Sequence, residues 1–76
     1  MKLKRDSVEG RVAQGVVDYA VGGPVVYISH LGGLTGLGVQ LSDRTMRLLR
    51  AAEHTKPGSE CRSELREMME EDIFDG

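Results

Sequence analysis

The chain is 76 residues long and carries ten Lys and Arg residues against twelve Asp and Glu residues, a net charge of −2. A chain this short is only marginally stabilised by burial, so we expect one small domain that associates as a homodimer. Its only cysteine, Cys61, excludes an intrachain disulfide and indicates a reducing, cytoplasmic setting.

The charge is unevenly distributed along the chain. Residues 1–56 carry eight Lys and Arg against five Asp and Glu, whereas residues 57–76 carry two against seven. A basic body with an acidic end is typical of a protein that contacts nucleic acid with one part and protein with the other, although an ordinary mixed surface is the alternative. The uncharged run over 19–42 contains six glycines and Pro24, which argue against a membrane-spanning helix.

The glycine-rich region 1–35 is predicted to form a β-hairpin. Two runs rich in Val, Tyr and Ile, "GRVAQGVVDYAV" and "PVVYISHL", flank Gly22 and Gly23, a pattern typical of two strands joined by a turn. A helix over 8–20 is the alternative, and Gly10 and Gly15 argue against it. The apolar face of that alternative helix comprises Val8, Val12, Val16 and Ala20.

The region 36–76 is predicted to contain a strand and two amphipathic helices. The alternating stretch "GVQL" indicates a short half-buried strand over 37–41. Ser42 or Asp43 then begins a helix that ends near Thr55, because Pro57 disfavours further helical turns. Ser59 begins the second helix, "ECRSELREMMEEDIF". The predicted fold class is therefore α+β: an N-terminal β-hairpin, then a strand–helix–helix unit in a single domain.

No pattern in the chain predicts an enzyme, a cofactor or a metal site. The stretch "LGGLTGLG" lacks the Gly-Lys-Ser/Thr ending of a phosphate-binding loop and indicates a flexible connection. His30, His54 and Cys61 lie too far apart in sequence to match a standard ligand spacing. No nucleophile–base constellation can be argued from spacing.

A basic stripe is predicted on the first helix. Arg44, Arg47 and Arg50 recur every third residue and spread over about a third of the helix circumference. Such a stripe is suited to binding phosphates through charge and bidentate hydrogen bonds. The alternative is a solvated face whose arginines form surface ion pairs.

The segments "VQLSDRTMRLLRAAEH" and "GSECRSELREMM" together resemble the ribbon-helix-helix family of DNA-binding proteins. The resemblance rests on an alternating strand, a Ser-Asp helix start, apolar residues at matching offsets and the "RSEL" opening of the second helix. It implies that strands 37–41 of two chains pair into a ribbon that enters the major groove, where Gln40 contacts a base. The function this predicts is a small dimeric transcriptional regulator or antitoxin-like protein of the phage or plasmid type.

Two sets of residues follow from this resemblance. The residues expected to contact DNA are Gln40, Arg44, Arg47, Arg50 and Lys56. The residues expected in the dimer interface are Leu37, Val39, Leu41, Leu49, Leu65 and Met69.

The competing hypothesis is a small acidic inhibitor or adaptor that acts by protein–protein contact. Its C-terminal helix would bind a basic surface of a partner protein through carboxylates and neighbouring apolar side chains. The residues expected in that contact are Glu67, Met68, Glu70, Glu71, Ile73 and Phe74.

Overall fold

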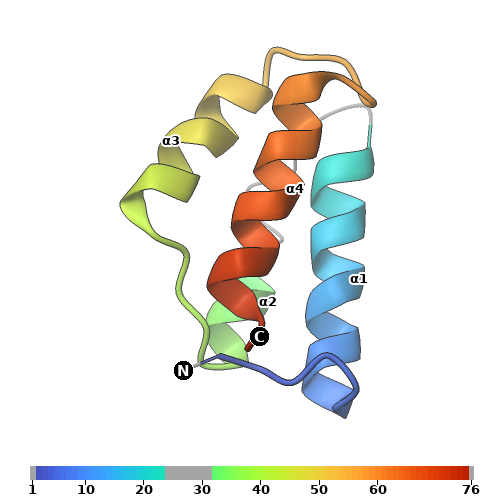
Figure 1. Ribbon diagram of the computed structural model, residues 1–76, viewed down its shortest axis with the longest axis vertical. Coiled ribbons are helices and arrows are strands. Elements are labelled where there is room, and N and C mark those ends of the chain that lie inside the picture. Colours follow the sequence, from blue (N-terminus) through green and yellow to red (C-terminus); the bar gives the residue numbers. More distant parts are fainter. Residues whose placement is uncertain (1, 24–31, 76) are drawn as a thin grey trace.

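The computed structural model describes residues 2–23 and 32–75, which contain four helices: α1 (Val8–Gly22), α2 (Gly32–Gly36), α3 (Asp43–Ala52) and α4 (Glu60–Ile73). Helix α4 lies in the middle, with α1 and α3 on either side of it and the short α2 behind (Figure 1). Helices α1 and α3 both pack against α4, and α2 packs against α1. None of the helices in these ranges has the length and apolar content needed to cross a membrane.

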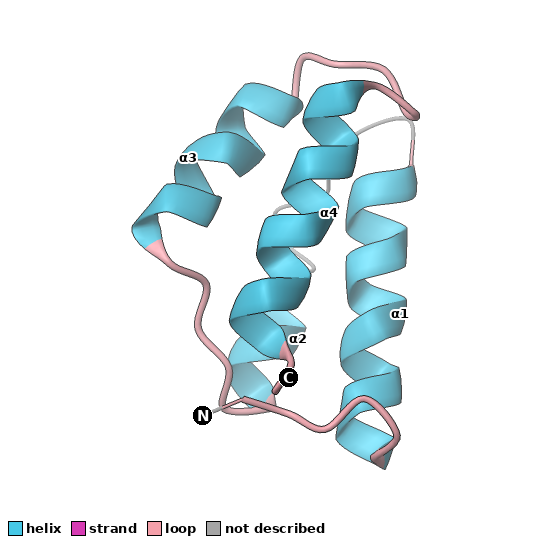
Figure 2. Cartoon of the chain, in the orientation of Figure 1, coloured by secondary structure: helices cyan, strands magenta, loops and turns pink. Residues whose placement is uncertain are grey.

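The predicted α+β fold is wrong, because the described residues form helices and contain no β-strand (Figure 2). The predicted strand 37–41 is instead the connection between α2 and α3, and it begins with a hydrogen-bonded turn at Leu37 and Gly38. Val39 is buried and Leu41 half-buried, whereas Gly38 and Gln40 are exposed, so the alternation does report which side chains face the core. A strand also needs a second strand for its backbone hydrogen bonds, whereas the amides of Leu37 and Val39 both donate to the Leu34 carbonyl at the end of α2.

The predicted N-terminal hairpin is also wrong, because its first strand lies within α1. The second run of the hairpin, 24–31, lies outside the described residues. The Ser7 hydroxyl accepts a hydrogen bond from the Gly10 amide at 2.9 Å and begins the helix. A Cβ at Gly10 would lie 2.0 Å from the carbonyl oxygen of Lys4. This glycine therefore allows the N-terminal segment to cross close to the helix, and it was misread as evidence for a strand.

The two helices of the second half begin where they were predicted, with their predicted caps, and the first ends at Ala52, three residues before its predicted end near Thr55. The hydroxyl of Ser42 accepts from the Thr45 amide at 3.2 Å, and that of Ser59 accepts from the Arg62 amide at 3.3 Å. The seven residues between α3 and α4 include Gly58, whose φ of 85° favours glycine. Local signals were sufficient here, because each of them acts within one turn of a helix.

The core lies along the inner faces of α1, α3 and α4 and is closed at one end by the two chain termini. The Leu3 amide donates to the Ile73 carbonyl at 2.7 Å, and the Asp75 amide donates to the Leu3 carbonyl at 2.9 Å. These bonds hold Leu3 and Phe74 against the end of the bundle, where both are buried. The buried apolar residues are Leu3, Ala13, Val17, Ala20, Val21, Leu34, Val39, Leu49, Ala52, Leu65, Met69, Ile73 and Phe74.

One charged side chain, Arg62 of α4, is also buried, with 1% of its surface exposed. On the α1 side, its Nη1 donates to the carbonyl oxygens of Val21 and Gly23 at 2.6 and 2.8 Å. On the α3 side, its Nε donates to the Ala52 carbonyl at 3.2 Å and its Nη2 to the Thr55 carbonyl at 3.0 Å. The guanidinium thus joins the C-terminal ends of two helices, where the carbonyl groups carry partial negative charge.

Candidate functional site

The outward side of α3 carries three exposed arginines. Helix α3 packs against α4 and against neither of the other described helices. Its buried residues are Thr45, Leu49 and Ala52, so they form one stripe that faces α4. The exposed residues Arg44, Arg47 and Arg50 lie on the opposite side of the helix. We call these three residues the arginine face.

The N-terminal end of α3 is held by Asp72 of α4. One oxygen of this carboxylate, Oδ2, accepts a hydrogen bond from the Ser42 amide at 2.9 Å and another from the Thr45 hydroxyl at 2.6 Å. A negative charge at a helix N-terminus is favourable, and hydrogen bonds to a charged acceptor are the stronger kind. With Arg62 at the other end, α3 is held by α4 at both termini. This arrangement fixes which side of α3 points outward.

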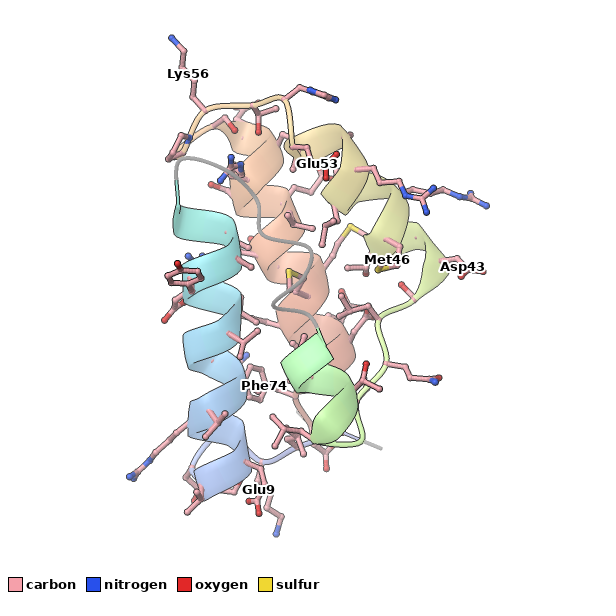
Figure 3. The ribbon with its side chains drawn as sticks, turned by 180° about the vertical axis from the view of Figure 1, so that it is seen from behind. Glu9, Asp43, Met46, Glu53, Lys56 and Phe74 are labelled. Carbon is pink, nitrogen blue, oxygen red and sulfur yellow. The ribbon has the colours of Figure 1, made fainter. Side chains whose placement is uncertain are left out.

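The arginines of the chain divide into two groups by their contacts. Arg5 pairs with Glu70, with 3.2 Å between Nη1 and Oε1, and its guanidinium lies 4.4 Å above the centre of the Phe74 ring. Arg66 pairs with Asp18, and Arg62 is buried as described above. In contrast, the arginine face forms no hydrogen bond or ion pair with any residue in the described ranges. Figure 3 shows nitrogen-tipped side chains that extend outward from α3 between the labelled Asp43 and Glu53.

Two other predicted DNA-contacting residues precede and follow α3 in the sequence. Gln40 is exposed in the connection that precedes α3, and Lys56 is exposed in the loop that follows it. The side chain of Lys56 extends away from the molecule in Figure 3. In that view Lys56 lies on the opposite side of the molecule from the side chains of α3, so it does not continue the arginine face. Because residues 37–41 do not form a strand, Gln40 does not lie in the two-stranded ribbon that the resemblance implied.

A second charged surface covers the outward side of α4. Its carboxylates follow one another at intervals of four, three and four residues, a spacing that places them on one side of a helix. These exposed residues are Glu60, Glu64, Glu67 and Glu71. We call them the acidic face, and they form no ion pair with any residue in the described ranges. Since α1 and α3 flank α4 (Figure 1), this face runs between them.

The residues predicted to bind a protein partner do not form one surface. Glu67 and Glu71 are exposed and belong to the acidic face, and Met68 is half-buried beside them. Glu70 is paired with Arg5. The last two residues of the set, Ile73 and Phe74, are buried in the core with 0% and 3% of their surface exposed.

The residues predicted in a dimer interface lie in the interior of a single chain. Val39, Leu49, Leu65 and Met69 are each at most 1% exposed. Leu37 and Leu41 are partly buried and pack against the same core. Their own chain therefore already covers the apolar surface that was expected to require a second copy.

Sequence reasoning missed the two residues that hold α3, Asp72 and Arg62. Asp72 belongs to the acidic end of the chain, and no pattern in the sequence points to its hydrogen bonds with Ser42 and Thr45. Arg62 lies three residues before Leu65 and seven before Met69, so the helical spacing already placed it on the buried side of α4. That spacing was the available signal that this arginine is structural.

The described residues offer no group of three or more His, Cys, Asp or Glu side chains arranged to hold a metal ion. No protein-family model matches the chain, and neither a curated protein nor a solved structure is detectably similar to it.

Proposed function

We propose that this chain is a non-enzymatic nucleic-acid-binding protein that contacts the phosphate backbone through the arginine face of α3. The observation that carries the proposal is the division of the seven arginines: three are used within the fold, three are presented together on α3 without an internal partner, and Arg11 stands by itself on α1. A guanidinium binds phosphate through two parallel hydrogen bonds and keeps its charge at every physiological pH.

The geometry of the arginine face suits a row of phosphates. The rise from Arg44 to Arg50 is about 9 Å along the helix axis, and the side chains spread over about a third of its circumference. Arg47 therefore lies at the centre of the surface, with one arginine on either side of it. Such contacts position a protein on nucleic acid without reading its sequence, so the proposal does not include base recognition by a ribbon.

The proposal is tested by measuring binding to fluorescent random-sequence duplex DNA over a range of salt concentrations. Three phosphate contacts predict a slope of about −2.7 in a plot of log K against log salt concentration, a loss of about 40-fold between 50 and 200 mM salt. Arg47→Ala should weaken binding to every sequence and reduce the slope by about 1.

Arg11 supplies the matched control, because it is an exposed arginine on α1 whose side chain forms no hydrogen bond or ion pair with the described residues. Arg11→Ala removes the same charge from a different helix and should leave the slope unchanged. Equal losses from the two variants would show that only net charge matters. Salt-insensitive binding, or no binding at low salt, would overturn the proposal.

The acidic face supports a second candidate function, binding to a basic surface of a partner protein. The specific observation is that Glu60, Glu64, Glu67 and Glu71 are aligned, exposed and unpaired within the described ranges. Deleting the chain beyond Glu67 is an unsuitable test, because it removes core residues such as Met69 and Ile73. The charge reversal Glu67→Lys/Glu71→Lys keeps the core intact. Binding to DNA that improves in this variant favours the first function, whereas loss of a basic protein ligand favours the second.

A further inference from the structure

Helix α1 turns an apolar face away from the core. Its buried residues Ala13, Val17 and Ala20 lie toward α4, yet on the opposite side Val8, Val12 and Tyr19 are 74%, 51% and 57% exposed. These three side chains and Gly15 occupy about a sixth of the helix circumference. An amphipathic helix at the surface of a monomer normally places polar residues there.

This face contains a shallow, open hollow. Val12, Gly15, Val16 and Tyr19 line it, and their spacing of three, four and seven residues is that of the four-residue hole that receives a knob from a neighbouring helix. A Cβ at Gly15 would meet no other atom within 4 Å. The single chain therefore does not need glycine here, although glycine weakens a helix interior, whereas a second helix approaching closely would need it.

Two residues of opposite charge lie along one border, that is, one long edge, of this apolar face. Arg11 and Asp18 lie two turns apart on the same border, and the midpoint between them falls beside Gly15. Arg11 is exposed, and its side chain forms no hydrogen bond or ion pair with the described residues. Asp18 pairs with Arg66 and accepts a hydrogen bond from Gln14, but its side chain remains 56% exposed and has room for another donor.

Residues on the same border of two packed helices face each other only when the helices run antiparallel. A twofold axis beside Gly15 then brings Arg11 of each copy opposite Asp18 of the other. The same axis places Val12 of one copy over the hollow of the other, and it places Val8 beside Tyr19 of the second copy. The apolar contacts and the ion pairs therefore favour the same arrangement, with the two copies of α1 antiparallel.

We propose that the outward face of α1 is the interface of an antiparallel homodimer, in which α1 of one copy packs on α1 of the other across Gly15. This interface is independent of the proposed function. Since α4 separates α1 from α3 (Figure 1), both arginine faces of such a dimer stay accessible.

The experiment is sedimentation equilibrium of the full chain from low micromolar to near-millimolar concentration. The wild-type protein should pass from 8.3 kDa to twice that mass. Val12→Asp should weaken association by about 100-fold or more, since the dimer would bury two carboxylates without partners. Val12 is half exposed in the single chain, so circular dichroism should show an unchanged fold. Ala51→Asp, at an exposed position of α3, is the matched control and should not change the association.

A charge exchange tests the arrangement of the two copies. Arg11→Glu should weaken association by about 3- to 10-fold, because it replaces two exposed ion pairs with two repulsions. Arg11→Glu/Asp18→Lys should restore most of the loss. A chain that remains monomeric at every concentration, or a dimer that Val12→Asp leaves intact, overturns the interface. A double variant that associates as weakly as the single variant overturns the antiparallel arrangement.

Discussion

Helices α1 and α3 lie on opposite sides of α4 and bury the same kind of residue against it, yet their outward faces are opposite in character. Both inward stripes consist of small and aliphatic side chains, with one buried threonine in α3. Outward, α1 presents valines and a tyrosine, whereas α3 presents three arginines. Packing on α4 explains why the inward stripes of both helices are apolar. It does not explain the valines and tyrosine on the outward side of α1 or the arginines on the outward side of α3. The outward faces are therefore where we seek contacts with other molecules.

The two helices nevertheless share one anchor, the guanidinium of Arg62. It donates to two carbonyl groups at the end of α1 and to two at the end of α3. No carboxylate among the described residues pairs with this charge. The partial negative charge at the two helix C-termini takes that place, so one side chain sets the position of both outer helices against α4.

The largest expected effect comes from removing this shared anchor. Arg62→Met retains much of the side-chain volume but leaves buried carbonyl groups of both helices without donors, so we expect the free energy of unfolding to fall by about 3–5 kcal/mol. Urea unfolding followed by circular dichroism measures this loss. Arg66→Met, on the same helix, removes a partly exposed ion pair and should cost less than about 1 kcal/mol. Similar losses in both variants would show that Arg62 does not anchor the outer helices.

The sequence predicted those parts of the fold that depend on neighbouring residues. The serine caps, Pro57 and the apolar spacing of α3 and α4 each act within a few residues, and the two helices begin where these signals lie. The exposure of the arginine face also followed from spacing alone. In contrast, the bonds of Asp72 and Arg62 join residues up to 41 positions apart, and no local pattern reports such distant partners.

The wrong predictions have the same origin. Gly10 indicated a break in a helix, but it is required because the N-terminal segment crosses α1 at that point. The alternation over 37–41 indicated a strand, but alternation shows only which side chains are buried and not whether a second strand lies alongside. In both cases the structure that the residues adopt depends on contacts with segments outside the pattern itself.

The next largest effect should act on α1 alone. Gly10→Ala forces a Cβ against the Lys4 carbonyl, 2.0 Å away, and the backbone there has little room to move because Ser7 bonds to the same carbonyl at 2.6 Å. We expect a loss of about 2 kcal/mol in unfolding free energy, measured in urea. Gly36→Ala is the control, since a Cβ there meets nothing within 4 Å. If Gly10→Ala were as stable as the wild type, the N-terminal segment would not be fixed on α1.

A smaller effect should act on α3 alone. Asp72→Ala removes the acceptor of the Ser42 amide and of the Thr45 hydroxyl, and since Asp72 is only partly buried we expect a loss of about 1–2 kcal/mol. Amide hydrogen exchange should show faster exchange in the first turn of α3 and no change in α1. Glu71→Ala removes a neighbouring exposed carboxylate and should leave both helices protected. Faster exchange in α1 as well would mean that the outer helices do not open separately.

The smallest expected effect is a gain in stability on the outward face of α1. Gly15→Ala adds a methyl group where a Cβ meets no other atom within 4 Å, and alanine should stabilise the helix interior by about 0.5–1 kcal/mol. Thermal unfolding at concentrations too low for association measures this gain in the single chain. A loss of stability there would mean that this face already belongs to the packing of one chain, and the contrast with α3 would fail. A gain that accompanies weaker self-association would separate two requirements at one position: folding of one chain prefers alanine, and the approach of a second helix requires glycine.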